Sequence, residues 1–229
     1  MAKTLHTAPP PPSPEATDGL SLRRFLRRLP SQSRSRMAVE SIITAFDELL
    51  QKRGDESVPL EVVAQRAGVG IGSLYEYFAN KDALLGGLIE KATRKNFTEL
   101  LSHVDATPGP LEARTRALAE AVVETYLRHP ARTNALMGGI IRLGLIRVVV
   151  AERDRFAREL AARALPLLPG AALDDLEVSM CLLCDAIMGV IHAELTRATP
   201  TDRALVADQL CSLTVATLRA RHPAPAATS

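Results

Sequence analysis

The sequence predicts an all-α protein with a small three-helix head followed by a larger helical body. Hydrophobic residues make up 47% of the 229 residues, yet aromatic residues make up only 3% and tryptophan is absent. Ala, Leu and Arg are abundant, and this composition favours helices packed through aliphatic side chains over a β-rich fold. A chain of this length can bury one large core or divide into a head and a body.

Residues 1–30 are expected to form a disordered arm that is rich in proline and in basic residues. Pro9 to Pro12 stand where a secretory signal would need an apolar core, so we expect a cytoplasmic protein. Residues 1–36 carry a net charge of +5, against −3 for the remainder. The arm either lies along DNA phosphates or in a minor groove, or is a solvated tail; a membrane-surface role is a weaker third interpretation.

The segment SQSRSRMAVESIITAFDELLQKRG predicts an amphipathic helix that follows the arm. Ser31 or Ser33 is the candidate N-cap, and Gly54 is the expected stop. The apolar stripe recurs at helical spacing and comprises Ala38, Ile42, Ala45, Phe46 and Leu49. This helix can brace the two short helices that follow it.

The most specific pattern is LEVVAQRAGVGIGSLYEYFA, residues 60–79, which predicts two short helices crossing at a tight turn. Val63 and Ala67 lie four residues apart on the inner face of the first helix, and Ala64 is small enough for a second helix to cross closely. Gly68 suits the left-handed backbone just past a helix end. Such a pair is a DNA-binding helix-turn-helix, although helical hairpins that bind nothing can share the spacing.

The second helix of this pair is expected to enter the major groove of DNA. Leu74, with Tyr77 or Phe78, faces inward and leaves the other side of the helix to DNA. The expected DNA-binding residues are Gly70, Ile71, Gly72, Ser73, Tyr75, Glu76, Tyr77 and Lys81, with Arg34 and Arg36 of the preceding helix.

A fourth helix is predicted to begin after Asn80, whose side chain can cap it. Lys81 and the amides of this helix end would both point toward the phosphate backbone of DNA. The expected buried face comprises Leu84, Leu85, Leu88, Ile89 and Ala92.

The stretches RSRMAVESIITAF and VVAQRAGVGIGSLYEYFANKDALL, with the run Tyr75-x-Tyr77-Phe78-x-x-Lys81, resemble the tetracycline-repressor (TetR) family of bacterial transcription regulators. The resemblance covers roughly residues 33–95. It implies an all-helical homodimer with a DNA-binding head at 31–80 and a divergent helical domain at 81–222 that binds a small effector and dimerises. Gly70 and Ile71 depart from the family pattern of a serine followed by a polar or basic residue, so side-chain readout of bases is expected to be sparse.

The body is expected to begin its own helices after the break at Pro108-Gly109-Pro110 and to end in a loose tail at 223–229. Gly138-Gly139 and Gly144 are expected bends, and Thr199 is the expected cap of the last helix. The expected helices span 111–128, 132–150, 151–168, 173–197 and 200–221. Candidate effector-binding residues, which could equally be plain core, are Tyr126, Met137, Ile140, Ile141 and Met188.

The helix over 173–197 carries an unusually small face that comprises Leu182, Ala186, Gly189 and Ala193. Such a face allows close approach of a partner helix. A single-chain bundle could use it internally, but the resemblance implies that it is the dimer interface.

Two further classes of function stay open beside a ligand-responsive repressor that leaves a palindromic operator when a small apolar or weakly anionic effector binds. One is an effector-independent architectural protein on DNA. The other, weaker, is a thiol or metal sensor that uses Cys181 and Cys184. Cysteines in apolar helical runs are more often buried hydrophobes, so we expect no metal and no cofactor.

Enzyme function is not expected, because the sequence shows no Ser/His/Asp or paired-carboxylate arrangement at a recognisable spacing. A membrane span is not expected either. The nearest apolar run, from Leu136 to Ala151, is interrupted by Arg142 and Arg147.

Overall fold

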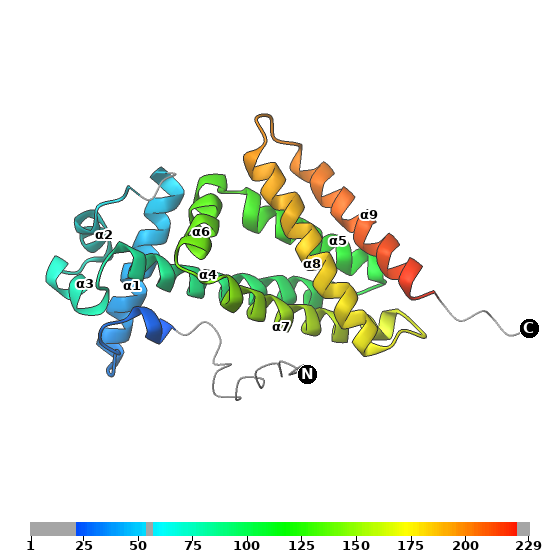
Figure 1. Cartoon of the computed structure of the whole chain (residues 1–229), viewed down its shortest axis with the longest axis horizontal. Coiled ribbons are helices and arrows are strands. Elements are labelled where there is room, and N and C mark those ends of the chain that lie inside the picture. Colours follow the sequence, from blue (N-terminus) through cyan, green and yellow to red (C-terminus); the bar gives the residue numbers. More distant parts are fainter. Residues whose placement is uncertain (1–21, 54–56, 224–229) are drawn as a thin grey trace, which may run out of the picture.

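The structure, a computed structural model, describes residues 22–53 and 57–223, and this part of the chain is folded entirely as helices and connecting turns. A head made of three helices lies at one end, and α4 extends from it into the larger body (Figure 1). The head comprises α1 (Ser33–Arg53), α2 (Leu60–Ala67) and α3 (Ile71–Tyr77). The other helices are η2 (Leu22–Phe25), α4 (Lys81–Ala106), α5 (Leu111–Leu127), α6 (Pro130–Arg142), α7 (Ile146–Ala164), η3 (Leu165–Leu167), α8 (Leu173–Thr196) and α9 (Arg203–Arg221).

The first helix of the head begins where the sequence predicts, but its local hydrogen bonds differ from the expected serine caps. The Ser35 hydroxyl accepts from the backbone N–H of Gln32 at 3.1 Å and donates to the Gln32 carbonyl at 2.8 Å. This reciprocal pair ties down the residue before the helix, so Ser31 and Ser33 are not the capping groups. The expected stop at Gly54 lies outside the described residues.

The buried face of α1 is rotated slightly from the expected stripe. Ile42, Ala45 and Phe46 are buried, as predicted, whereas Ala38 and Leu49 are only partly covered. The buried positions outside the expected stripe are Val39, Ile43 and Leu50. Successive residues of an α-helix lie about 100° apart around its axis. A stripe inferred from spacing alone can therefore be displaced by one residue.

The turn between α2 and α3 has the predicted geometry. Gly68 has φ 69° and ψ 28°, in the left-handed region where a Cβ is penalised. The chain then bonds back onto α2, since the N–H of Val69 donates to the Ala64 carbonyl at 3.0 Å. Val63 and Ala64 are buried beneath the crossing. The local sequence therefore defines this crossing of two short helices.

The fourth helix starts with the predicted cap. The Asn80 side chain accepts from the N–H of Ala83 at 2.8 Å, and all five expected inward residues are buried. The core of the head continues along α4 as far as Ala92 and takes in Leu136 of α6. The expected boundary after residue 80 therefore does not separate two packing units, because the first half of α4 belongs to the head.

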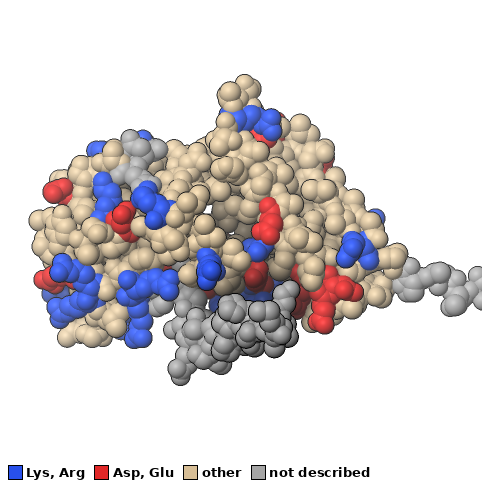
Figure 2. Space-filling model, in the orientation of Figure 1, with Lys and Arg blue, Asp and Glu red and all other residues tan. Residues whose placement is uncertain are grey.

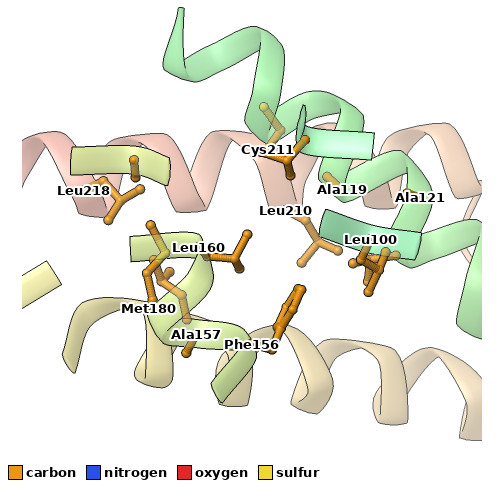
Figure 3. Close-up of a cluster of buried hydrophobic side chains, with 14 of the residues drawn as sticks. Leu100, Ala119, Ala121, Phe156, Ala157, Leu160, Met180, Leu210, Cys211 and Leu218 are labelled. Atoms are coloured by element: carbon orange, nitrogen blue, oxygen red, sulfur yellow. The ribbon is translucent and has the colours of Figure 1, made fainter. Parts of the chain in front are cut away.

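A second core fills the body between α4, α5, α7, α8 and α9. Its labelled side chains are turned toward the space between these helices, with Phe156 opposite Leu100 and Leu210 (Figure 3). The rings of Phe97 and Phe156 stack with their centroids 4.7 Å apart. Aliphatic side chains supply most of this core, which fits the low aromatic content of the sequence.

Two expected boundaries in the body are wrong, whereas the expected bend at Gly144 is confirmed. α6 ends at Arg142 and α7 begins at Ile146, so the break lies at Gly144, φ 65°, and not near residue 150. Gly138 and Gly139 lie inside α6 and do not bend it. The cap of α9 is Asp202, which accepts from the N–H of Leu205 at 3.1 Å, so Thr199 is not the cap.

Among the described residues, α8 is long and apolar enough to cross a membrane by length and composition, with mean hydropathy 1.7 over a window that is 33% buried. The segment from Pro130 to Leu167 passes the same test only as a pair of helices bent by 117°. The apolar run expected from the sequence to come nearest to a membrane span, Leu136 to Ala151, lies earlier in the chain. Core helices of soluble proteins also meet these criteria.

The end of the expected arm is ordered and packs on α4. The Phe25 ring lies over Gly86, where an added Cβ would come within 2.2 Å of it, and Leu22 lies over Gly87 in the same way at 2.9 Å. The N–H of Arg27 donates to the Tyr77 carbonyl at 2.9 Å. The arm predicted over 1–30 is therefore structured from Leu22 onward, because two small residues on α4 leave room for its side chains.

Truncation separates the two parts of this segment. Removing residues 1–21 should leave the melting temperature nearly unchanged, whereas removing 1–30 should destabilise the head by roughly 2–4 kcal/mol, since Leu22, Phe25 and Leu26 are each partly buried. Urea unfolding of both truncations against the full chain measures the difference. Equal stability of the two truncations would mean that the contacts on Gly86 contribute little.

Candidate functional site

The outward surface of α3 combines small residues with two larger side chains and one carboxylate. Gly70, Gly72, Ser73 and Glu76 are exposed, and Ile71 and Tyr75 expose 38% and 41% of their surface. Leu74 is fully buried and anchors the helix to the head. The expected DNA-binding positions of α3 other than Tyr77 thus share one accessible side.

Two glycines on this side are not required by the fold. A Cβ added at Gly70 or at Gly72 would meet no atom within 4 Å, and both residues have negative φ. Their lack of a side chain leaves a flat surface that another molecule can approach closely. Glycine at such positions commonly marks a close backbone approach to a ligand.

Tyr77 does not belong with the exposed residues. It is 8% exposed and lies in the core of the head with Phe78. Both aromatic residues considered for the inward position therefore face inward. Its edge borders a surface groove that Arg34, Ser73 and Gly70 also line. Tyr77 can therefore support this groove, but most of its side chain is not available to DNA.

Basic residues gather at the head end of the molecule. Figure 2 shows Lys and Arg side chains concentrated at the lower left, over the head, while the body carries both signs of charge. Arg23, Arg24, Arg27, Arg28, Arg34 and Arg36 are all exposed. Arg28 reaches toward Glu76 of α3, with 3.9 Å between Nη1 and Oε2, which places the end of the arm beside α3.

The body contains an apolar cavity of about 150 Å³ between α4, α5, α6, α7 and α8. Four of the five expected pocket residues line it: Tyr126, Met137, Ile140 and Met188. The fifth, Ile141, does not line the cavity and leaves 69% of its surface exposed. Residues that the sequence analysis missed include Phe97, Leu100, Arg132, Val149, Arg153 and Phe156.

One end of this cavity is polar. Burial raises the pKa of the Tyr126 hydroxyl, and a hydrogen bond with Asn96 acts in the opposite direction. Thr133 donates to the Tyr126 carbonyl at 2.7 Å, which ties the start of α6 to the end of α5. Asn96 and Arg132 border both the cavity and an open polar groove between α1, α4 and α5. A ligand in the cavity would therefore find hydrogen-bonding groups at this end, while Arg153 adds a second charged donor elsewhere in the lining.

α6 connects the cavity to the head. On one side it lines the cavity through Met137 and Ile140; on the other, Gly139 packs so closely on α4 that an added Cβ would lie 2.8 Å from Leu85 and 2.9 Å from Ile89. Arg132 at its start forms a two-pronged ion pair with Asp47 of α1, in which Nη2 lies 3.1 Å from Oδ2. A displacement of α6 would act on α1 and α4 directly.

The small face predicted on α8 is uncovered. Leu182, Ala186, Gly189 and Ala193 are all exposed, and Leu182 leaves 65% of its surface open. Val178, one turn earlier, is 56% exposed. No atom lies within 4 Å of a Cβ built on Gly189. No described part of the chain covers this face, whereas the single-chain alternative requires another helix of the same chain to cover it.

The cysteines sit in apolar surroundings. Cys184 lines the cavity and Cys211 is buried, while Cys181 is partly covered. Burial raises the pKa of the Cys184 thiol to about 12 and is also the main cause of the raised pKa values of Cys181 and Cys211. The described residues contain no group of three or more His, Cys, Asp or Glu side chains that could hold a metal ion. These thiols resemble buried hydrophobes more than reactive thiolates.

Comparison with known proteins gives a family match on the head and partial matches to curated regulators. Residues 42–88 match the family model of bacterial regulatory proteins of the tetR family. The HTH-type transcriptional repressor KstR of Rhodococcus jostii is 34% identical over 97 residues, which cover 42% of this chain and 43% of that protein. An uncharacterized HTH-type transcriptional regulator of Mycobacterium tuberculosis is 27% identical over 82 residues, 36% of this chain and 41% of that protein. The chain spans less than half the length of these curated relatives.

Solved structures extend the likeness to most of the chain. A tetR-family transcriptional regulator from Streptomyces coelicolor superposes with a TM-score of 0.64 at 20% identity and covers 81% of this chain and 82% of its own. SmeT, the repressor of the Stenotrophomonas maltophilia multidrug efflux pump SmeDEF, gives a TM-score of 0.54 at 19% identity, over 78% of this chain and 88% of its own. At these identities the likeness establishes the fold, a helix-turn-helix head with a larger helical domain. The family model matched on that same head shows that residues 42–88 are a segment of the kind found in bacterial regulatory proteins of the tetR family.

Proposed function

We propose that this chain is a cytoplasmic, homodimeric transcription regulator that represses by binding a palindromic operator and leaves it when a small apolar effector binds. The observation that carries the proposal is the exposed side of α3, which lies within the residues matched by the family model and belongs to a head tied through α6 to an apolar cavity. A ligand-controlled regulator needs a DNA-facing helix, a ligand cavity and a connection between the two, whereas an enzyme does not need this combination.

α3 would lie in the major groove, with its glycine-lined side close to the bases. Ser73, Tyr75 and Glu76 are the side chains available for polar contacts there, and none of them is basic, so much of the affinity would come from phosphate contacts made by other residues. The exposed arginines that flank the head, together with Lys81 at the start of α4, suit that role. The end of the arm lies beside α3 and would follow the backbone or enter the adjacent minor groove.

The open face of α8 supports dimerisation. Contiguous exposed apolar residues commonly mark an interface, and small residues allow two helices to approach closely. α9 adds Leu205 and Leu213, eight residues apart and therefore on one side of that helix, which expose 50% and 47% of their surfaces. Pairing these helices across a two-fold axis would present two heads to successive major grooves, about 34 Å apart.

The cavity supports control by a ligand over an effector-independent architectural role. A ligand shifts a conformational equilibrium only by the difference between its affinities for the two states. α6 supplies that difference, because it both lines the cavity and contacts α1 and α4. A ligand that moved α6 would change the spacing of the two heads, and DNA would be released.

Selection of bound fragments from the source genome tests the proposed function. Purified protein is incubated with sheared genomic DNA, and the retained fragments are sequenced and confirmed by fluorescence anisotropy. A palindromic site near the protein's own or a neighbouring gene is the expected result. Binding without sequence preference would support the architectural role instead.

Replacing Lys81 by alanine tests the phosphate contacts. The Lys81→Ala variant should bind every DNA sequence more weakly by a similar factor, and the slope of log affinity against log salt should fall by about 0.9 unit per lost contact. Lys95→Ala, on the same helix but in the body, is the matched control and should behave as the unmodified chain. Unchanged affinity and salt slope in Lys81→Ala would place the phosphate backbone elsewhere.

A further inference from the structure

The charge of the cavity lining is one-sided. Among the described residues that line it, Arg132 and Arg153 are charged, and none is Asp or Glu. The rest of the lining is apolar apart from a few hydroxyl, amide and thiol groups. Carboxylates behind the lining pair with both arginines, so the preference for an anion would come from guanidinium N–H donors that face a weakly hydrated site and not from net charge. The lining thus offers charged donors but no charged acceptor to a ligand.

The two arginines differ in how fully they are already paired. Arg153 is held by Asp154 at 2.9 Å, by Asp185, and by the Cys181 carbonyl at 3.1 Å. Arg132 is held by one carboxylate, that of Asp47. A guanidinium can donate five hydrogen bonds, so Arg132, held by a single carboxylate, retains donors for a further acceptor.

Arg132 also stands at the junction of the cavity and the head. Its side chain is 12% exposed and borders both the closed cavity and the open groove that Asp47 lines. Tyr126, hydrogen-bonded with Asn96, lies at the same end of the cavity. A ligand carboxylate placed there could accept two parallel hydrogen bonds from the guanidinium, the arrangement that arginine forms best with carboxylates.

We propose that the effector is a small apolar acid whose carboxylate binds Arg132 in competition with Asp47, so that effector binding loosens the joint between α6 and α1. The inference rests on the proposed function and names the ligand class and the residue pair that transmits binding. Asp47 is 24% exposed and borders the open groove, so its carboxylate can be hydrated when the pair separates.

The size of the cavity limits the apolar part of this acid. A dry cavity of about 150 Å³ in another protein holds a single benzene ring. The lining combines aliphatic and aromatic side chains, with Met137 and Met188 able to adapt to different shapes. A single substituted ring or a chain of about eight carbons therefore fits the space.

Calorimetric titration with matched probes tests the ligand class. Octanoate and 4-ethylbenzoate are compared with the neutral octanamide and the cationic octylamine. At least one acid should bind, octanoate about tenfold or more tightly than octanamide, because hydrogen bonds to charged groups are the stronger ones. Octylamine should bind more weakly than octanamide. Failure of both acids at millimolar concentration, or equal affinity for octanoate and octanamide, overturns the proposal.

Substitutions of individual arginines test which of them binds the carboxylate of the acid. In Arg132→Met, octanoate and octanamide should bind equally well, whereas Arg142→Met, an exposed arginine on the same helix, should keep the full preference. Arg132→Lys retains the charge and should keep part of it, which provides a check if Arg132→Met folds poorly. Loss of the preference in Arg153→Met, with retention in Arg132→Met, would place the anion at the other end and overturn the assignment.

Substitution of Asp47 tests whether binding of the acid at Arg132 is transmitted to the DNA-binding head or only holds the ligand in the cavity. Asp47→Asn removes the competing charge and should bind octanoate about tenfold more tightly. Octanoate should weaken operator binding by the unmodified chain about tenfold or more, but by less than about twofold in Asp47→Asn. If the unmodified chain binds no operator, the proposed function fails, whatever the acids do. If operator and octanoate both bind but the Asp47 variant responds as the unmodified chain, the coupling proposed here fails alone.

Discussion

Gly72→Glu is expected to lower operator affinity by more than about a hundredfold while the protein stays folded. The new side chain would project from the exposed side of α3, where it meets no atom of the head, and would bring a negative charge against the bases and phosphates of DNA. Like charges brought together at an interface cost several kcal/mol, enough for a loss of this size.

The thermal stability of Gly72→Glu should stay the same or rise, although its operator affinity falls. Glycine inside a helix costs roughly 0.5–1 kcal/mol relative to alanine, so Gly72→Ala and Gly72→Glu should both melt at or above the temperature of the unmodified chain. Gly72→Ala is also the control for size, and its operator affinity should fall far less than that of Gly72→Glu. Fluorescence anisotropy and thermal unfolding give the two quantities. Gly72→Glu with unmodified operator affinity would place the recognition surface somewhere other than α3.

Gly189→Arg is expected to convert the dimer to monomers and to remove operator binding with it. A two-fold axis through the α8 face would place two new guanidinium groups in one interface, and an unpaired buried charge costs several kcal/mol. The dimer dissociation constant should therefore rise by more than about a thousandfold. The monomer should tolerate the change, since space beside Gly189 is open.

The control for this substitution is Ala162→Arg, which adds the same group to an exposed position of α7. Sedimentation equilibrium of both variants measures the association, and circular dichroism checks the fold. Ala162→Arg should remain dimeric. A Gly189→Arg variant that sediments as a dimer would move the interface away from the small face of α8 and leave that face for another partner.

The local elements of this fold could be predicted because they depend on neighbouring residues. Gly68 in the turn and Asn80 at the start of α4 act within a few residues of their own position. The buried sides of α2, α3 and α4 follow from helical spacing over one or two turns. The small face of α8 also follows from spacing, because its residues recur on one side of a single helix, but spacing left open whether another part of the chain covers that face.

The prediction was weaker where several helices meet. Met137 and Ile140 line the cavity but Ile141 does not, and the direction of each depends on how α6 is rotated against α4. Asp202 took the place of Thr199 as the cap of α9, because either residue suits the local pattern and the packed position of the helix selects one.

The linear order of residues was enough to define an all-helical chain, its helix-turn-helix and its basic N-terminal side. It could not show that Phe25 packs on Gly86, or that Arg132 meets Asp47 from 85 residues away. Helix signals act through hydrogen bonds and periodicity within a few residues. A cavity, and an ion pair that links it to the head, exist only after distant helices have packed, because their contacts depend on the relative rotation and spacing of whole helices.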